Sequence, residues 1–193
     1  MWSLTTAAVT FAVIFPAELP DKSLLASLVL GTRFRTLPVW LGASAAFVVH
    51  VVIAVAAGGL LRLLPSTVVD IVVTVLFALG AALLLLGREE EADEVDVPAG
   101  VTSTARMFWT SFGVVFVGEW GDITQLATAN LAARYDDPLS VGVGAGLALV
   151  SVAGLVLLAG NKILQRVPLA LVRRGAGLLL AVLALIGLVQ LLR

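Results

Sequence analysis

The sequence predicts an all-α membrane protein whose six transmembrane helices form two three-helix repeats of inverted topology. Of its 193 residues, 60% are hydrophobic and only 13% are charged, whereas a soluble domain commonly carries about a quarter of charged residues. Six apolar stretches each approach the roughly 20 residues that a helix needs to cross a bilayer. The third observation is an internal repeat, in which an acidic motif recurs 101 residues farther along the chain.

The composition also excludes several kinds of site and partner. The chain has no cysteine, so disulfides and thiolate metal sites are excluded. Its formal net charge of −1 provides no basic surface for nucleic acid, and no nucleic-acid partner is expected. No basic residue precedes the first apolar stretch, so we expect a first membrane span there rather than a cleavable signal peptide.

The predicted helices begin and end at charged or turn-forming residues. In chain order they cover Leu4–Leu30, Leu37–Leu61, Thr67–Leu86, Phe108–Ala133, Leu139–Ala159 and Leu169–Leu192. Between the third and fourth helices, the charges of residues 88–105 favour a solvated linker over an acidic loop that attracts metal. The chain therefore divides into a first three-helix repeat at residues 1–87, this acidic cytoplasmic linker, and a second three-helix repeat at residues 106–193.

The lysines and arginines between the helices predict the orientation of the chain. The loops of one side carry eight of them, namely Arg33, Arg35, Arg88, Arg106, Lys162, Arg166, Arg173 and Arg174. The other side carries three, Arg62, Arg134 and Arg193. By the positive-inside rule the first side faces the cytoplasm. We therefore expect a multi-pass protein of the plasma membrane, with both termini outside and the central loop in the cytoplasm.

The internal repeat keeps a constant register that includes charged and hydroxyl side chains. The matched pairs are Glu18 with Glu119, Asp21 with Asp122, Ser23 with Thr124, Ser27 with Thr128, and Arg33 with Arg134. Each repeat holds three spans, an odd number, so the second repeat must enter the membrane from the opposite side. Many secondary transporters are built from such inverted repeats and bind their substrate where the two repeats meet.

The acidic residues of the two motifs, Glu18-Leu-Pro-Asp21 and Glu119-Trp-Gly-Asp122, fall near the middle of the first and fourth predicted spans. Each acidic residue at that depth costs about 2.5–3.5 kcal/mol on insertion scales, so the two motifs should face one another inside the bundle. The spacing of three residues puts each acidic pair on one helix face. We predict a metal site formed by Glu18, Asp21, Glu119, Asp122 and Gln125.

Further residues are predicted to support this site. Pro20 removes an amide donor and Gly121 weakens the matching turn, which leaves carbonyl oxygens that can serve as ligands. Lys22 brings the one positive charge of the first motif. Four hydroxyl side chains either assist the site or bond back to a carbonyl of their own helix; these are Ser23, Ser27, Thr124 and Thr128.

Two other features of the sequence have more than one interpretation. His50, mid-way along the second predicted span, either relays protons or hydrogen-bonds to a neighbouring helix, and we favour the second. The small-residue patterns Gly42-x-x-x-Ala46 and Gly142-x-x-x-Gly146 permit close helix approach. We expect those contacts inside the six-helix unit rather than between subunits of a homo-oligomer.

The predicted ligands are hard oxygen atoms, which suit Mn²⁺, Ca²⁺ or Mg²⁺. Clustered carboxylates in a medium of low dielectric bind protons when no metal neutralises them, so metal and protons compete for the same oxygens. This competition favours a secondary transporter that exchanges a divalent cation for protons. We expect no enzyme activity and no prosthetic group, the metal ion being the transported substrate.

Duplicated Glu-x-Gly-Asp-(Lys/Arg)-(Ser/Thr) motifs in six spans resemble the transmembrane protein 165 family of manganese/calcium–proton exchangers. The resemblance covers nearly the whole chain, and it implies that Mn²⁺ or Ca²⁺ leaves the cytoplasm against incoming protons. It also implies that the family's motif positions are held by Glu18, Asp21, Lys22 and Ser23 and by Glu119, Asp122 and Thr124. Two residues depart from the motif: Pro20 replaces its glycine, and Ile123 replaces the basic residue of the second copy.

Two alternatives to cation exchange stay open at the level of the sequence. A LysE-like exporter of small organic solutes is one, although Lys22 is the only cation near the site that could bind a substrate carboxylate. A membrane scaffold without transport is the other, and the cost of four buried acidic residues argues against it.

Overall fold

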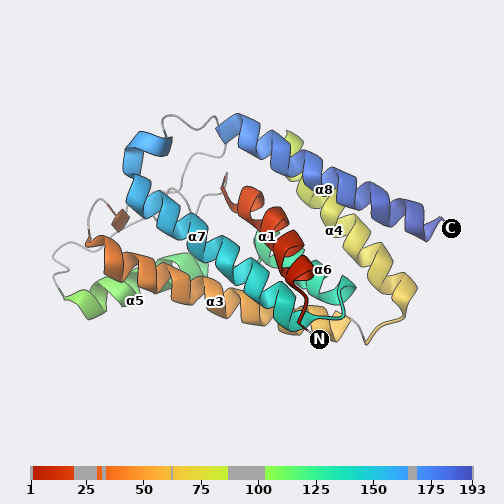
Figure 1. Ribbon diagram of the computed structural model, residues 1–193, viewed down its shortest axis with the longest axis horizontal. Coiled ribbons are helices and arrows are strands. Elements are labelled where there is room, and N and C mark those ends of the chain that lie inside the picture. The colour runs from red at the N-terminus through yellow and green to blue at the C-terminus, as the bar shows by residue number, and fades with distance from the viewer. Residues whose placement is uncertain are drawn as a thin grey trace.

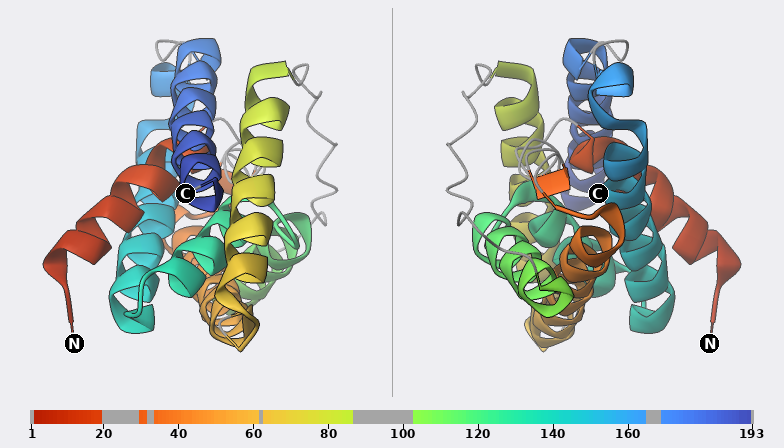
Figure 2. Two further views of the ribbon diagram at one scale, coloured as in Figure 1. Left: turned by 90° about the vertical axis from the view of Figure 1, so that its right-hand side faces the viewer. Right: turned by 90° about the vertical axis from the view of Figure 1, so that its left-hand side faces the viewer.

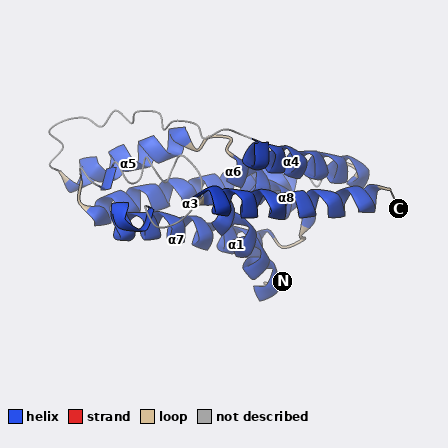
Figure 3. Ribbon diagram, turned by 90° about the horizontal axis from the view of Figure 1, so that it is seen from above, coloured by secondary structure: helices blue, strands red, loops and turns tan. Residues whose placement is uncertain are grey.

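The computed structural model describes residues 2–19, 30–31, 34–61, 63–86, 103–164 and 169–192, and its regular elements in these ranges are all helices (Figures 1 and 3). They are α1 (Leu4–Glu18), α3 (Thr36–Leu61), α4 (Ser66–Leu86), α5 (Thr104–Gly118), α6 (Ile123–Arg134), α7 (Pro138–Leu164) and α8 (Leu169–Leu191). The all-α prediction is thus confirmed for the described residues.

Four of these helices are long and apolar enough to cross a membrane. They contribute the spans Thr36–Leu61, Thr67–Leu86, Pro138–Leu158 and Arg174–Leu191. Leucines and valines cover much of their outer faces, for example Leu79 and Leu158, which suits contact with lipid. The protein is therefore a multi-pass membrane protein. The helices α1, α5 and α6 have 15, 15 and 12 residues, fewer than the roughly 20 that one span needs.

The predicted fourth span, Phe108–Ala133, is wrong as a continuous helix. The structure divides it into α5 and α6, with a turn between Gly118 and Ile123. The turn depends on Gly121, whose φ of 77° is a left-handed conformation that glycine adopts at little cost. In the predicted first span, Leu4–Leu30, the helix α1 ends at Glu18, and residues 20–29 lie outside the described residues.

Helix α3 lies between α5 and α7, and its contacts give the relative directions of these helices. Gly42 near the start of α3 faces Phe108 near the start of α5, and farther along His50 faces Phe116. The two helices therefore run in the same direction. By contrast, Trp40 near the start of α3 donates a hydrogen bond to Val150 well inside α7. The other half of α3 packs near Gly142 at the start of α7, so these two helices are antiparallel.

Helix α1 runs in the same direction as α7. The backbone amide of Ser3 donates to the hydroxyl of Ser140 at the start of α7, and Phe15 near the end of α1 packs against Val152 farther along α7. Since α7 is antiparallel to α3, and α3 is parallel to α5, the helices α1 and α5 run in opposite directions. Helices α4 and α8 lie side by side as a separate antiparallel pair (Figure 2), in which Thr74 contacts Gly187 and Gly80 contacts Leu180.

The pairs α1–α7 and α5–α3 make matching contacts, in which the residues of α1 and α5 are 101 positions apart and the two glycines, Gly42 and Gly144, are 102 positions apart. At Gly144 a Cβ atom would collide with the carbonyl oxygen of Ala7, and at Gly42 it would collide with that of Phe108. The hydroxyl of Thr10 donates to a carbonyl one turn earlier in α1 at 2.8 Å, and Ser111 does the same in α5 at 2.8 Å. Gly42 therefore packs inside the bundle as expected, whereas in the second small-residue pattern the closest contact is at Gly144.

A capping cluster fixes the starts of α1 and α7 to each other. The hydroxyl of Ser140 donates to the Asp137 carboxylate and accepts from the Ser3 amide, while the Ser3 hydroxyl accepts from the Thr6 amide at 3.2 Å. The hydrogen bond from the Ser140 hydroxyl holds the pKa of the Asp137 carboxyl below its usual range. The Asp137 carboxylate also accepts from the Ser140 amide at 3.1 Å, so at each of the two helix N-termini a side chain accepts from one of the free amides.

Candidate metal centre

Three carboxylates from distant parts of the chain meet inside the bundle. Glu18 is the last residue of α1, Glu119 follows α5, and Asp122 precedes α6. One oxygen of each lies within 4.8 Å of an oxygen of the other two. Glu18 is 0% exposed and Glu119 is 5% exposed, and Asp122 is half-buried. The structure therefore brings Glu18 of the first motif next to both acidic residues of the second.

The break between α5 and α6 positions two of these carboxylates. Helix α5 stops at Gly118, and the amide of Glu119 still bonds to the carbonyl of Val115 at 3.0 Å. After the left-handed Gly121, the Asp122 side chain caps α6 by accepting a 2.7 Å hydrogen bond from the Gln125 amide. The break thus places Glu119 after the end of α5 and Asp122 before the start of α6, and an oxygen of each lies within 4.8 Å of an oxygen of Glu18.

Thr124 links the two motifs directly. Its hydroxyl lies 3.0 Å from a Glu18 carboxylate oxygen and 2.7 Å from an Asp122 carboxylate oxygen. Thr128, one turn later, donates instead to the carbonyl of Thr124 at 2.7 Å. The sequence left two roles open for these hydroxyls, contact with the site or a hydrogen bond to the same helix. Thr124 has the first role, because it contacts the acidic cluster, and Thr128 has the second, because it bonds back to its own helix.

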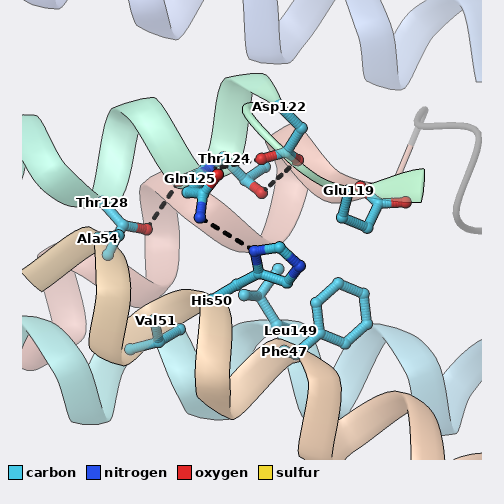
Figure 4. A pocket seen from close by; sticks show the side chains of 10 residues that line it. All are labelled: Phe47, His50, Val51, Ala54, Glu119, Asp122, Thr124, Gln125, Thr128 and Leu149. Atoms are coloured by element: carbon cyan, nitrogen blue, oxygen red, sulfur yellow. Dashed lines mark hydrogen bonds between the residues drawn. The ribbon is translucent and has the colours of Figure 1, made fainter. Parts of the chain in front are cut away.

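Gln125 lies beside the carboxylates and uses both ends of its amide. Its Oε1 accepts a 2.7 Å hydrogen bond from the amide of Gly121, and its Nε2 lies 2.9 Å from Nδ1 of His50 on α3 (Figure 4). The other ring nitrogen of His50 is 3.0 Å from the carbonyl oxygen of Phe116. His50 is thus bonded to neighbouring helices, as expected, and it also lies beside the acidic cluster, a position that the sequence did not predict.

A cavity of about 10 Å³ opens between these polar residues and the apolar side of α3 and α7. That volume is at the lower limit of the space that holds one water molecule. Its polar wall consists of Glu119, Asp122, Thr124, Gln125 and His50, and Thr128 lies at one end (Figure 4). The apolar wall comes from Phe47, Val51, Ala54 and Leu149. The cavity thus has a polar wall that includes two carboxylates and an apolar wall from α3 and α7.

Five of the predicted site residues, Pro20, Asp21, Lys22, Ser23 and Ser27, lie outside the described residues. The remaining predicted residues, Glu18, Glu119, Gly121, Asp122, Thr124, Gln125 and Thr128, gather around the break between α5 and α6. The sequence singled out His50 because it lies mid-way along its predicted span, but it did not indicate that His50 lies beside the acidic cluster.

Comparisons with known proteins identify the family of the chain. A sequence model of the family described as "Divalent cation/proton antiporter GDT1" matches the chain twice, at residues 6–92 and 107–193. The chain is 31% identical to the "Putative manganese exporter" of Vibrio cholerae over 92% of its own length and 88% of the relative's. It is 26% identical to a GDT1-like protein of Synechocystis over 95% of its own length and 97% of the relative's.

Plant relatives are longer than this chain. The chain is 26% identical to the chloroplastic PAM71-homolog of Arabidopsis thaliana, of which it spans 45%, with 70% of its own length covered. No solved structure matches the chain. The two family matches fall on the two predicted repeats and include both acidic motifs, and they confirm the resemblance that those motifs indicated. The chain belongs to the GDT1 family of divalent cation/proton antiporters.

Proposed function

We propose that this protein exports Mn²⁺ or Ca²⁺ from the cytoplasm in exchange for protons, and that Glu18, Glu119 and Asp122 hold the cation. One observation carries the proposal: three carboxylates from two repeats place oxygens within 4.8 Å of one another, with two of the carboxylates almost fully buried. Burying like charges together is costly unless a cation or protons neutralise them. The family relation supports cation/proton exchange as the reaction, and the proximity of the three carboxylates is the reason for choosing them as ligands.

The ligand chemistry favours a hard divalent cation. All three acidic side chains offer carboxylate oxygens, which Ca²⁺ and Mn²⁺ accept readily. The name of the Vibrio cholerae relative specifies manganese, which supports Mn²⁺ as the first ion to test. We retain Gln125 as a predicted fourth ligand, since its carbonyl oxygen has a second lone pair beside the one that Gly121 uses. Asp21 remains a predicted ligand from the first motif.

Charge balance links the cation to protons. Three ionised carboxylates carry three negative charges, of which a divalent cation neutralises two. Thr124 adds a constraint, because its hydroxyl has one hydrogen and lies within bonding distance of two carboxylates. It can donate to only one of them, and its contact with the other is favourable when that carboxyl carries a proton. A cation that takes these oxygens displaces such a proton, which is the exchange that we propose.

The proposed transport mechanism uses two inverted repeats of three spans each, with α5 and α6 together forming the fourth span. The opposite directions of α1 and α5 and the matched contacts of Gly42 and Gly144 support this arrangement. The site then lies where the two repeats meet. Small movements of one repeat against the other expose it to each side in turn, as in other transporters with inverted repeats.

Several helix ends that the proposed orientation places on one side of the membrane also contact one another. The start of α1 bonds to the start of α7 through Ser3 and Ser140, and Arg134 at the end of α6 bonds to Gln190 at the end of α8 at 2.6 Å. The end of α3 packs against the end of α6, where Gly58 meets the carbonyl of Ala129. All these ends belong to the face that the positive-inside rule places outside.

The test is transport by the purified protein in liposomes under an imposed pH gradient. Mn²⁺ flux should occur together with an opposing proton flux, which a pH-sensitive dye records. Glu18→Gln and Glu119→Gln remove one negative charge each and keep the side-chain volume, and each should abolish Mn²⁺ flux. The same variants should lose the thermal stabilisation that Mn²⁺ gives to the parent protein, because only a bound ligand stabilises the folded state.

Two results would contradict the proposal. Mn²⁺ flux without opposing proton movement would exclude exchange. Equal binding of Mn²⁺ by the parent and by the double variant would show that these carboxylates do not form the cation site. Glu91→Gln in the predicted linker removes a glutamate outside the site and provides the matched control for a general effect of charge.

A further inference from the structure

His50 bridges the two sides of the break between α5 and α6, and its hydrogen-bond pattern is fixed by its partners. Its Nε2 lies 3.0 Å from the carbonyl oxygen of Phe116. A carbonyl oxygen can only accept, so Nε2 carries the hydrogen. Nδ1 of the neutral ring is then an acceptor, and the Gln125 amide nitrogen donates to it at 2.9 Å. This assignment leaves the Gln125 oxygen to accept from the Gly121 amide, which is the contact found at 2.7 Å.

The Phe116 carbonyl needs such a donor because α5 ends nearby. In a continuous helix it would accept from the amide of residue 120. Here the Trp120 amide bonds to Val117 instead, at 3.4 Å. His50 therefore caps one of the carbonyls that a helix C-terminus leaves without an amide partner. Its ring also packs against Phe116 and Trp120, with centroids 5.0 and 5.8 Å apart.

The other branch of the bridge reaches the turn itself. Through Gln125, His50 holds the amide of Gly121, the residue whose left-handed conformation turns the chain. Along the chain, Glu119 lies between Phe116 and Gly121, and Asp122 lies between Gly121 and Gln125. His50 thus contacts, directly or through Gln125, residues on both sides of each acidic residue. The separation of their carboxylates therefore depends on a side chain of α3 that is not itself one of the proposed ligands.

We propose that His50 is a positioning residue that sets the spacing of the Glu119 and Asp122 carboxylates and thereby favours Mn²⁺ over the larger Ca²⁺. This inference rests on the proposed function of the same site. Selectivity among hard cations depends on cavity size and on the rigidity of the ligands, and Ca²⁺ tolerates variable coordination. Residues that orient metal ligands typically change metal affinity 10- to 100-fold when they are replaced. Loosening the break should therefore weaken Mn²⁺ binding more than Ca²⁺ binding.

Three substitutions at this position separate its two hydrogen bonds. His50→Phe keeps an aromatic ring and removes both bonds. His50→Asn places an amide oxygen near the position of Nδ1 and preserves the acceptor for Gln125. His50→Gln places an amide nitrogen near the position of Nε2 and preserves the donor to Phe116. Trp40→Phe is the matched control, because Trp40 also donates from α3 to a backbone carbonyl, that of Val150 at 3.2 Å, but lies outside the cavity lining.

The measurement is the thermal stabilisation of each purified full-length variant as MnCl₂ or CaCl₂ is added, which gives an apparent Kd for each ion. The ratio of the two constants is taken within one variant, so a general loss of stability cancels. We expect His50→Phe to raise the Kd for Mn²⁺ about tenfold or more and the Kd for Ca²⁺ by less. His50→Asn and His50→Gln should each restore part of the selectivity, and Trp40→Phe should retain all of it.

The proposal is overturned if His50→Phe keeps the parent's ratio, or if all three His50 variants and Trp40→Phe change it equally. The Asn and Gln variants keep a polar side chain in the bundle, so they provide the test if His50→Phe does not fold. A parent protein that binds neither ion would instead contradict the proposed function. Binding by the parent with unchanged selectivity in the variants contradicts only the role of His50.

Discussion

At the scale of single residues, Thr124 is the clearest link between the two acidic motifs. Its side chain is 2% exposed, and its hydroxyl contacts Glu18 of the first repeat and Asp122 of the second. Thr124 therefore connects a carboxylate of the first repeat with a carboxylate of the second.

Replacing Thr124 by valine should weaken Mn²⁺ binding without unfolding the protein. Valine has nearly the same shape but removes the hydroxyl that contacts the buried Glu18 carboxylate and the half-buried Asp122 carboxylate, at a cost of about 1–3 kcal/mol. We expect an apparent Kd for Mn²⁺ about tenfold higher or more, measured by calorimetry on the purified protein. Thr124→Ser keeps the hydroxyl and should bind close to the parent. Equal weakening by serine and valine would show that the methyl group, and not the hydroxyl, matters.

The sequence predicted that Glu18, Glu119 and Asp122 meet, with Gly121 and Thr124 beside them, but it did not predict the contacts of His50 with this group. Glu18 and Glu119 could be paired because acidic residues at mid-membrane depth are costly and a constant register relates them. The role of His50 could not be predicted, because its contacts with Phe116 and Gln125 depend on how α3 packs against α5 and α6. Periodicity and composition say which side of a helix is apolar, but not which residue of another helix lies opposite.

At the scale of elements, the break between α5 and α6 was only partly predictable. Gly118 and Gly121 both suggest a weak point in a helix. Only Gly121 takes the left-handed conformation, and Gly118 is the last residue of α5. The other sequence feature that favours the break is Asp122, which caps the start of α6 and also belongs to the acidic cluster. One residue thus has a structural role and a proposed ligand role, and sequence reasoning assigned it only the second.

Gly121→Ala should therefore destabilise the site, whereas Gly118→Ala should not. A Cβ atom would contact nothing within 4 Å at either position, so steric collision is not the cause. Alanine at a φ of 77° costs about 1–2 kcal/mol from backbone strain alone. At Gly118, alanine improves helix propensity by up to about 1 kcal/mol. Reversible unfolding in mixed micelles measures both changes, and equal effects would mean that the conformation of Gly121 is not needed.

Alanine substitutions at Gly42 and Gly144, where two helices come close together, test whether the α3–α5 and α1–α7 pairs are packed equivalently. At each position alanine would collide with a backbone oxygen of a neighbouring helix, Phe108 or Ala7, and backbone cannot move aside cheaply. We expect each substitution to cost about 1–3 kcal/mol, as overpacking usually does. Gly146→Ala, where a Cβ atom has open space, is the control. A large loss at one of the two glycines and none at the other would contradict equivalence.

At the scale of the whole molecule, the two repeats should cross the membrane in opposite directions. The antiparallel directions of α1 and α5 agree with this, and equivalent residues of the two repeats should then face opposite sides. Trp2 and Ser103 are such a pair, since they are 101 residues apart and both are exposed just before a helix. Their sidedness distinguishes inverted repeats from parallel ones, in which the pair would face the same side.

Trp2→Cys should react with a membrane-impermeant maleimide added to intact cells, and Ser103→Cys should react only after the membrane is opened. The chain has no cysteine of its own, so each variant carries a single reactive thiol without background. The expected difference follows from the positive-inside rule, which places the start of α1 outside and the arginine-bearing start of α5 in the cytoplasm. Mn²⁺-dependent stabilisation of each variant verifies that it is folded. Labelling of both thiols from the same side would exclude inverted topology, and with it the alternating-access mechanism that depends on the two repeats exchanging roles.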